Sequence, residues 1–301
     1  MVKEEHPYVY EVDFDSGEAS ARVLRMIKPG SRVLEIGAGP GSITRHLSGT
    51  LACSVVALEI DPSSVEVLQQ FAPKVHALDL NDLAWSETIL REDGLFDYVI
   101  AADVLEHVYD PWKVLAGMTS LLAPKGAVIL SLPHVGHASV AACLVDEDFE
   151  YWPWGLLDRT HIRFFGIKNM QTLINGAGLV IEQAEFVIRT PLMTEFAARW
   201  ARLPSDIQAA LQRNRYSNVL QTVTCSRLGS AGRAGLDLMA MTPEPPQRAA
   251  EKHWTRVMRM QVNDRATDLR STLSAKPFWS LRFPIAGRVK RIIRKIRRKK
   301  I

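Results

Sequence analysis

The chain has 301 residues, of which 47% are hydrophobic and 23% charged, and its formal net charge is +4. This composition suits one globular domain with an appended segment, or two small domains. It holds no run of roughly 20 apolar residues that could span a bilayer, and its polar, acidic start resembles no secretory signal. Three widely spaced cysteines indicate no disulfide framework. We therefore expect a cytoplasmic protein.

The positive charge is concentrated at the end of the chain. The last fourteen residues, "RVKRIIRKIRRKKI", hold nine Lys or Arg and no acid. The other residues carry 28 basic and 33 acidic side chains, so the body has a net charge of −5. This asymmetry predicts that the tail lies outside the fold and has either an acidic partner of its own or none.

The first half of the chain alternates short apolar runs with helical patterns. Helices are expected at 16–27, at 41–47, after Pro62 and at 111–122. Strands are expected between them, at 32–36, 54–60, 74–78, 96–102 and 127–133. Close alternation of strands and helices predicts an α/β fold with a doubly wound, mostly parallel sheet.

The second half is less regular. Residues 133–167 form a long connection rich in His and Trp, and "NMQTLINGAGLVIEQAEFVI" predicts a helix followed by a sixth strand. Residues 191–234 are expected to be mainly helical, and "LDLMAM", at 236–241, is the candidate last strand. A linker at 244–248 follows, then an amphipathic helix at 249–273 and a basic tail at 274–301.

A glycine-rich turn after the first strand indicates the ligand. Gly37, Gly39 and Gly41 follow the acid Glu35, and glycine lets a ligand approach the backbone at a helix start. A dinucleotide fingerprint needs its third glycine where this chain has Ser42. A carboxylate would also repel a pyrophosphate, whereas it attracts a ligand with an ammonium, a sulfonium and no phosphate. The pattern therefore predicts S-adenosylmethionine.

Two further acids end the next two strands. Glu59 lies eighteen residues past Gly41, where an acid accepts hydrogen bonds from both ribose hydroxyls. Asp79 ends the third strand and is placed to bind the adenine amino group. The alternative, that both are solvated loop acids, is disfavoured because "EIGAGPG" precedes them in register. Ligands of open α/β sheets bind at this carboxyl edge.

These motifs together resemble those of class I S-adenosylmethionine-dependent methyltransferases. "VLEIGAGPG" is similar to the family's first motif, "LEIDP" to its second and "ALDL" to its third, and the resemblance covers residues 15–185. It implies a seven-stranded sheet with a final antiparallel strand, in a domain of residues 1–243 with a helical cover at 190–234. The residues that we expect to bind the cofactor are Glu35, Gly37, Ala38, Gly39, Gly41, Glu59, Ile60, Asp79, Leu80, Ala102 and Glu106.

The segment after the fourth strand bears on the methyl acceptor. It reads "AADVLEHV", whereas enzymes that methylate amino groups of nucleic acids typically carry D/N-P-P-Y there, so nucleic acid is a disfavoured partner. "VLEHV" resembles the version found in small-molecule methyltransferases. For Glu106, a role in holding the loop at a helix start is the more ordinary interpretation. We assign no metal ligands from the sequence.

The long connection carries a more specific resemblance. "SLPHVGHASV" and "GLLDRTHIRFFG" resemble "PNxxHxSV" and "GLLDRTHxRFF", motifs associated with methyltransferases of bacterial surface-polysaccharide clusters of the O-antigen type. The chain departs from them with His134 in place of Asn and with "YWPW" in place of a Tyr-Thr pair. A glycan or another sugar-containing molecule is the acceptor that the resemblance implies.

A sugar hydroxyl becomes a good nucleophile when a positioned base removes its proton, which accelerates reactions by about 10²–10⁴-fold. Histidine suits that work near neutral pH, and His137 and His161 are the candidate bases. Asp158 lies three residues before His161, where it would orient the ring or act itself.

The same connection offers groups for the acceptor. Arg159 and Arg163 would bind an anionic sugar, and Trp154 would stack on a sugar ring; His134 is a further candidate contact. The alternative is that "DRTHIRFF" is a structural clasp with its phenylalanines in the core and its charges paired.

The basic tail forms a separate hypothesis. Apolar residues at helical spacing between Val289 and Ile296, preceded by Phe278, Trp279 and Phe283, predict an amphipathic helix on an anionic membrane surface. The tail resembles "SWRLTxPLRxxGR" ends of polysaccharide-assembly proteins, so we expect peripheral attachment, through residues 278–301, at the inner face of the cytoplasmic membrane. A disordered tail or one drawn to nucleic acid is the alternative.

Three functions therefore remain open beside glycan O-methylation. The first is a small-metabolite O-methyltransferase of the quinone type. The second is a non-catalytic, cofactor-binding partner that docks a glycosyltransferase through residues 249–273. The third, nucleic-acid modification, predicts binding that depends steeply on salt.

Overall fold

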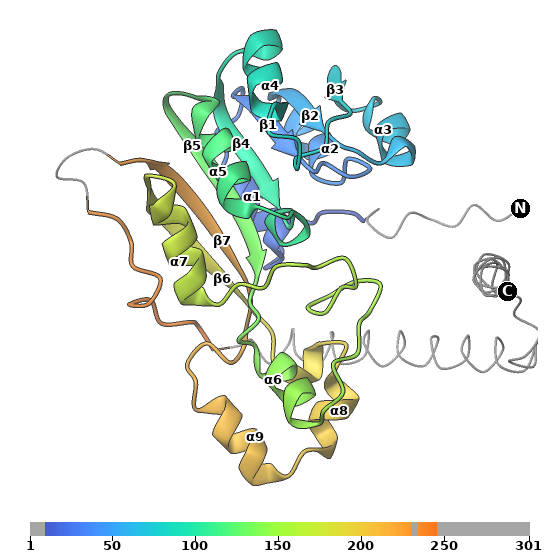
Figure 1. The fold of residues 1–301 in the computed structure, drawn as a ribbon, viewed down its shortest axis with the longest axis vertical. Helices are drawn as coiled ribbons and strands as arrows, with labels where there is room; N and C mark the ends of the chain where they lie inside the picture. The colour runs from blue at the N-terminus through green and yellow to red at the C-terminus, as the bar shows by residue number, and fades with distance from the viewer. Residues whose placement is uncertain (1–9, 230–233, 246–301) are drawn as a thin grey trace, which may run out of the picture. The chain divides into compact units, whose positions relative to one another are not determined.

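A seven-stranded sheet organises the part of the chain that the computed structural model describes, residues 10–229 and 234–245 (Figure 1). The strand order is β3-β2-β1-β4-β5-β7-β6, and β7 runs antiparallel to both of its neighbours. The strands are β1 (Arg32–Ile36), β2 (Ser54–Leu58), β3 (Lys74–His76), β4 (Phe96–Ala102), β5 (Leu122–Pro133), β6 (Leu179–Ile188) and β7 (Val219–Leu228).

Helices cover both faces of this sheet. One face carries α4 (Trp85–Asp93), α5 (Pro111–Ser120) and α7 (Ile167–Gly176), and the other carries α1 (Ala19–Arg25) and α2 (Thr44–Gly49). The helix α3 (Pro62–Leu68) packs near β2. A further group lies beyond the end of the sheet in Figure 1, with α6 (Ala138–Val145), α8 (Ala197–Arg202) and α9 (Ser205–Gln212).

Alternation along the strands places a core on each face. In β1, Leu34 and Ile36 pack with α4 and α5, whereas Val33 faces α1 and α2. Successive side chains of a strand point to opposite faces, and four of the five residues of β1 are buried. This two-sided burial explains why the central strands read as nearly continuous apolar runs.

Local sequence fixes the starts of two helices at the site's edge. The Asp61 carboxylate accepts a hydrogen bond from the Ser64 amide (2.8 Å), and Pro62 follows at the first helical position of α3. The same arrangement begins α5, where Asp110 accepts from the Lys113 amide (3.1 Å) ahead of Pro111.

The α/β fold, the seven strands and the antiparallel last strand are confirmed, but two expectations for the second half are wrong. Residues 191–234 are not mainly helical, because β7 lies within them, between β5 and β6. Buried hydroxyl residues occupy alternate positions of this strand, at Thr222, Thr224 and Ser226. They mask its alternation, since a strand inside the sheet is buried on both faces.

"LDLMAM" is not a strand. Residues 238–240 form a turn, Leu238 is buried in the core, and the Tyr216 hydroxyl donates to the Met239 carbonyl (2.9 Å). The helices α4 and α6 were not expected from the sequence. Both are short and carry their apolar residues against other elements rather than in a long periodic pattern.

Several expected features lie outside the described residues. These are the segment at 249–273, the basic tail at 274–301 and the anchor residues 278–283. Among residues that the structure describes, no helix has both the length and the apolar character needed to cross a membrane.

Candidate active site

The carboxyl ends of β1, β2 and β4 meet where the strand order reverses, between β1 and β4. Parallel register aligns Glu35 of β1 with Ala57 of β2 and Ile100 of β4. Open α/β sheets bind their ligands in the crevice at such a switch point. The predicted motifs therefore lie where this fold places a site.

The glycine-rich turn leaves β1 in a conformation that favours glycine. Gly37, Gly39 and Gly41 all have positive φ values, of 63°, 53° and 88°. A Cβ atom at Gly37 would lie 2.6 Å from a methyl group of Val104, so the turn packs directly on the loop after β4. A Cβ atom at Gly39 would meet no atom within 4 Å, which leaves open space for a ligand above this residue.

Glu35 is buried beneath the turn. Its carboxylate accepts a hydrogen bond from the Thr44 hydroxyl (2.6 Å). The pKa of Glu35 is raised to about 8, mainly by burial; the Thr44 hydrogen bond opposes this shift and the nearby Glu59 contributes to it. A cationic ligand beside Glu35 would restore the charged form, because an opposite charge favours ionisation.

Glu59 binds the turn from the end of β2. One carboxylate oxygen accepts from the Gly39 amide (2.7 Å), and the other accepts from the amides of Ile60 (2.8 Å) and Asp61 (2.9 Å). Carboxylate oxygens have about four acceptor positions in all. At least one therefore remains for a ribose hydroxyl. Ile60 is exposed, and Ala38 is buried against α3.

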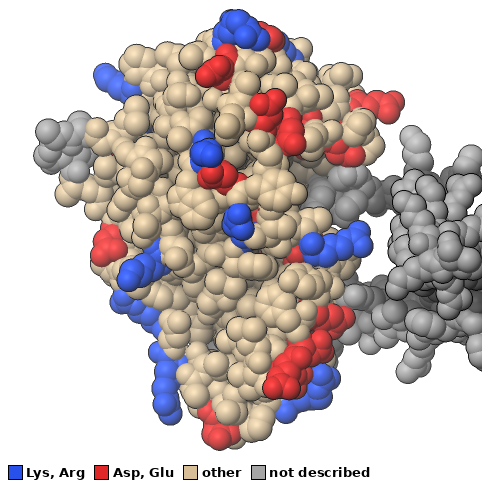
Figure 2. Space-filling model, viewed as in Figure 1, with Lys and Arg blue, Asp and Glu red and all other residues tan. Residues whose placement is uncertain are grey.

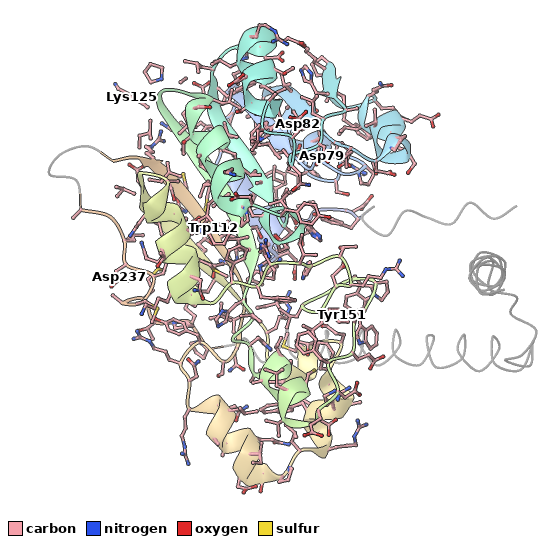
Figure 3. All side chains as sticks on the ribbon, viewed as in Figure 1. Asp79, Asp82, Trp112, Lys125, Tyr151 and Asp237 are labelled. Carbon is pink, nitrogen blue, oxygen red and sulfur yellow. The ribbon has the colours of Figure 1, made fainter. Side chains whose placement is uncertain are left out.

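Asp79 lies on the loop after β3, near Asp82 (Figure 3). Its side chain is exposed and accepts from the amide (2.8 Å) and the side-chain nitrogen (2.9 Å) of Asn81. Asn81 in turn accepts from the Tyr109 amide (2.9 Å), which links this loop to the segment after β4. Leu80 packs against the core beneath. This exposed carboxylate also suits an amino group at the site's rim.

The turn after β4 is constrained by a residue that the sequence reasoning did not single out. Asp103 follows Ala102 and has a positive φ of 56°. Its carboxylate accepts from the Ser131 hydroxyl (2.8 Å) and from the Gln221 amide nitrogen (2.8 Å). It thereby ties β4 to β5 and β7 at the site's edge. In the sequence, only the presence of an acid after the fourth strand, in "AADVLEH", could have indicated Asp103.

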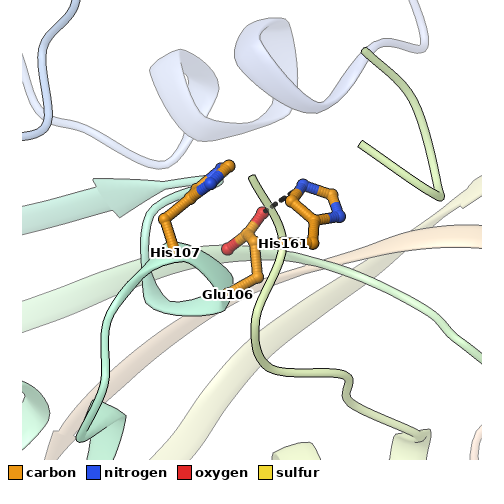
Figure 4. A group of neighbouring side chains, drawn as sticks. All are labelled: Glu106, His107 and His161. Atoms are coloured by element: carbon orange, nitrogen blue, oxygen red, sulfur yellow. Dashed lines mark ion pairs between the residues drawn. The ribbon is translucent and has the colours of Figure 1, made fainter. Parts of the chain in front are cut away.

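Glu106 and His161 meet beside this turn (Figure 4). Glu106 lies in a 3₁₀ turn, Leu105–His107, and is fully buried. Its Oε1 atom is 3.9 Å from Nε2 of His161. Within the described residues, neither carboxylate oxygen of Glu106 has a hydrogen-bond partner. Burial raises the pKa of Glu106 well above its usual value, and the nearby acids Asp103 and Asp158 add to the shift.

His161 is the candidate base that the structure brings to this edge. Its Nδ1 atom lies 3.3 Å from the Leu156 carbonyl, and its ring packs edge-on against His107 (4.7 Å between centroids). Burial lowers the pKa of His161 to about 4, and His107 contributes in the same direction. The imidazole is therefore neutral at pH 7.

Asp158 shapes the loop before His161, and its carbonyl accepts a hydrogen bond from the His161 amide (3.0 Å). Its carboxylate accepts from the amide (2.8 Å) and the hydroxyl (2.7 Å) of Thr160, and the Thr160 hydroxyl also contacts His107 Nδ1 (3.0 Å). The Thr160 hydroxyl therefore links the Asp158 carboxylate to the imidazole of His107. This position favours a positioning role.

The segment "DRTHIRFF" clasps the Glu106 turn. The amides of Ile162 and Arg163 both donate to the Glu106 carbonyl, at 2.9 and 3.0 Å. The Arg163 guanidinium donates to the Tyr109 carbonyl, at 3.1 Å from Nε. These hydrogen bonds give Arg163 a structural role, as the structural-clasp alternative predicts. His161 of the same segment lies beside Glu106.

His137 is placed differently from His161. It is fully buried, and it begins α6, where its Nδ1 accepts from the Ser139 amide (3.1 Å). Its Nε2 donates to the Arg189 carbonyl (2.8 Å). Burial lowers the pKa of His137 to about 4. Because both ring nitrogens are engaged with backbone, the geometry favours a structural role for this residue.

The remaining acceptor candidates are spread along the connection. His134 is buried at the end of β5, and burial lowers its pKa to about 4. Arg159 is exposed and forms no ion pair within the described residues, so its guanidinium is available to an anion. Trp154 is half-buried and packs edge-on against Trp152, with 5.9 Å between ring centroids.

A buried acid that the sequence reasoning missed holds this connection in place. Glu195 follows β6 and accepts a hydrogen bond from the Leu156 amide (2.7 Å). Burial raises its pKa to about 7. The contact spans 39 residues, so no local pattern in the sequence could have paired the two segments.

A doubly wound sheet with this strand order, and with acids at three successive strand ends, defines a nucleoside-binding fold of the class I methyltransferase type. A family model described as "Methyltransferase domain" matches residues 13–184, which is more than half of the chain. The chain therefore belongs to this methyltransferase family.

Known relatives are distant. The ubiquinone biosynthesis O-methyltransferase of Xanthomonas campestris pv. campestris (strain B100) is 29% identical over 131 residues, 42% of this chain and 52% of the relative. The enzyme of the same name from Burkholderia thailandensis is 25% identical over 173 residues, 56% of this chain and 73% of the relative. The chain thus spans about half the length of the first relative. A solved S-adenosylmethionine-dependent methyltransferase from Archaeoglobus fulgidus is 15% identical, with a TM-score of 0.49 over 69% of this chain and 91% of that chain.

The family match is consistent with S-adenosylmethionine, the cofactor predicted from the sequence, and the residues present fit it. The open space above Gly39 accommodates a ligand that lies against the turn. Glu35, Glu59 and Asp79 would supply carboxylates for its ammonium, ribose and adenine amino groups. The cofactor supplies a methyl group activated on a sulfonium.

Proposed function

We propose that the protein O-methylates a sugar hydroxyl of a cell-surface polysaccharide, or of its lipid-linked or nucleotide precursor. The observation that carries this proposal is the place of "GLLDRTHIRFF". This segment folds onto the Glu106 turn, and its His161 comes within 3.9 Å of the Glu106 carboxylate at the carboxyl edge of the sheet. The position of a segment that resembles motifs of surface-polysaccharide methyltransferases, beside the Glu106 turn, supports a sugar acceptor.

Side chains around this edge suit a sugar ring with a negative charge. Arg159 is exposed on the same segment, and half-buried Trp154 offers an aromatic face. His161 is neutral at pH 7, as a group must be to accept a proton. We assign to His161 the activation of the acceptor hydroxyl, and to Asp158 and His137 the positioning of the surrounding loops.

A quinone-type small metabolite is the second candidate acceptor. The observation in its favour is the similarity to ubiquinone biosynthesis O-methyltransferases, which covers 42–56% of this chain in the two relatives described above. Both candidates need an activated hydroxyl, so the chemistry at His161 is the same for each.

Nucleic acid is a weaker candidate. The face of the protein shown in Figure 2 carries acidic and basic side chains in small, separate groups rather than a continuous basic surface.

We further propose a cytoplasmic location, with residues 278–301 attaching the protein to an anionic membrane surface and residues 249–273 contacting a glycosyltransferase.

Mass spectrometry of the surface glycan from cells with and without the gene tests the acceptor. We expect the glycan to lose about 14 Da for each missing methyl group, and a copy carrying His161→Ala to leave that loss unrepaired. An unchanged glycan, together with methyl transfer to a phenolic quinone precursor by the purified protein, would replace the sugar with the second candidate.

A further inference from the structure

Glu106, His107 and His161 form a cluster whose geometry has no explanation in the cofactor site. One carboxylate oxygen and two ring nitrogens, one from each residue, lie within 4.8 Å of one another (Figure 4). They come from two segments more than fifty residues apart, the turn after β4 and the segment "DRTHIRFF". The fold brings them together at the carboxyl edge of the sheet.

In both imidazoles Nδ1 faces a backbone carbonyl. Nδ1 of His161 lies 3.3 Å from the Leu156 carbonyl, and Nδ1 of His107 lies 3.3 Å from the Thr160 carbonyl. A carbonyl fixes Nδ1 as the donor, so Nε2 of each ring is left as the lone-pair atom. Histidines that bind a metal through one ring nitrogen usually donate a hydrogen bond from the other in this way.

The carboxylate completes the donor set. Glu106 is fully buried, and within the described residues neither of its oxygens has a hydrogen-bond partner. A buried acid without a partner is costly, and such a group calls for an explanation such as an unseen ion. Nε2 of His161 lies 3.9 Å from Oε1 of Glu106, which is too far for a hydrogen bond.

From this cluster we propose a binding site for one divalent transition-metal ion, of the zinc type, held by Glu106, His107 and His161. Two imidazoles with one carboxylate suit such an ion better than Mg²⁺, which prefers oxygen ligands. Ligands around a tetrahedral zinc lie about 3.4 Å apart at bond lengths near 2.1 Å. The cluster therefore closes on the ion through shifts of roughly an ångström, within the reach of side-chain torsions.

Three protein ligands leave a coordination position open, as in catalytic zinc sites. This inference rests on the proposed function, because the open position is where the acceptor hydroxyl binds. The ion lowers the pKa of that hydroxyl, the O–H bond breaks, the proton goes to solvent and the oxygen stays on the ion as an alkoxide. His161 then activates the acceptor as a ligand of the ion and not by taking up the proton itself.

The chain offers a matched control cluster. His76, Glu92 and Asp93 also bring three ligand atoms together. There, however, His76 Nε2 bonds Asp93 (2.7 Å), and Lys74 pairs with the same carboxylate (2.9 Å). Because its charges are already paired within the protein, this second cluster is expected to bind no ion.

The test is metal binding by the full chain after treatment with a chelator. Calorimetry with Zn²⁺, and absorption spectra with Co²⁺, should report one ion per chain in the unchanged protein and in His76→Ala. Glu106→Gln and His107→Ala should each weaken binding by at least about 100-fold, the upper limit for loss of a mere second-shell partner. His107 is partly exposed, so His107→Ala keeps the test valid if Glu106→Gln fails to fold.

Absence of a bound ion in the unchanged protein would overturn the metal site. Binding by the Glu106→Gln and His107→Ala proteins as tight as in the unchanged protein would also overturn it. Methyl transfer that persists after complete chelation would overturn the role of the ion in activating the acceptor, while leaving the proposed function intact with His161 as the base. Conversely, an ion bound as expected in a protein that methylates no glycan would remove the acceptor proposal alone.

Discussion

The turn after β1 and the segment "DRTHIRFF" both border the site, but they are held in different ways. In the turn, Glu59 bonds amides at Gly39, Ile60 and Asp61, so a strand-end acid and glycines at fixed spacing define the cradle. The segment "DRTHIRFF" is held by contacts from far along the chain, with Glu106 and through Glu195. The comparison teaches that the turn predicted to bind the cofactor is fixed by residues close in sequence, whereas the segment predicted to serve the acceptor is held by residues far along the chain.

The largest effect that we expect is a loss of kcat when His161, in the segment "DRTHIRFF", is replaced. We expect His161→Ala to lower kcat by about 10²–10⁴-fold, because the hydroxyl loses the group that activates it. Cofactor affinity should stay within about twofold, since no cofactor-binding residue changes. Steady-state methyl transfer and calorimetry with S-adenosylhomocysteine measure the two quantities. A His161→Ala protein with near-normal kcat would move the chemistry away from this segment.

The second effect is a dependence of cofactor affinity on pH. Burial raises the pKa of Glu35 from 4.5 to about 8 in the folded protein, and a cationic ligand requires the ionised form. Binding therefore expels a proton below pH 8, and affinity should rise by up to about tenfold per pH unit between pH 6 and 8. Titration calorimetry at several pH values measures this slope, and Glu35→Gln should flatten it.

The sign is opposite for the stability of the protein without cofactor. Between pH 4.5 and 8 the folded protein holds the Glu35 proton more tightly than the unfolded chain does. The contribution of Glu35 to the free energy of unfolding should therefore be greatest below pH 4.5 and fall as pH rises to 8. Denaturant unfolding of the unchanged protein and of Glu35→Gln isolates that contribution. Equal pH slopes in the two proteins would contradict the raised pKa.

Particular residues show why the sequence predicts the turn after β1 better than it predicts the connection after β5. Glu35, the three glycines and Glu59 lie within 25 residues of one another, and their spacing carries the geometry. By contrast, the hydrogen bond between His137 and the Arg189 carbonyl spans 52 residues. The sequence could indicate that His137 matters, but not that both of its nitrogens bind backbone. The strand β7 was missed for a related reason, since Thr222 and Thr224 are polar residues buried by neighbouring strands.

His137 therefore offers the third test, on stability. His137→Ala should lower the free energy of unfolding by about 1–3 kcal/mol, because α6 loses its cap and the Arg189 carbonyl loses its donor. His46→Ala is the matched control. His46 is partly exposed, with a long contact to Thr50 (3.4 Å) and an edge-on contact to Phe14 (5.3 Å between ring centroids), and its loss should cost less than about 1 kcal/mol. Denaturant unfolding compares the two. A stable His137→Ala protein that has lost kcat would return His137 to the candidate bases.

The smallest effect concerns the glycine turn and separates backbone strain from ligand contact. Gly30 and Gly39 both have positive φ, of 74° and 53°, and a Cβ atom at either would meet no protein atom within 4 Å. Alanine at either position should therefore cost a similar amount of stability, about 1 kcal/mol. Only Gly39 lies in the turn that faces the cofactor.

We therefore expect Gly39→Ala to weaken cofactor binding by about tenfold, since the added methyl group occupies ligand space, and Gly30→Ala to leave binding unchanged. Calorimetry with S-adenosylmethionine, beside denaturant unfolding of both variants, measures the pair. Equal affinity in the two variants would mean that the open space above Gly39 is not where the cofactor lies. The cradle would then have to be moved to another part of the carboxyl edge, toward Asp79, whose side chain is exposed.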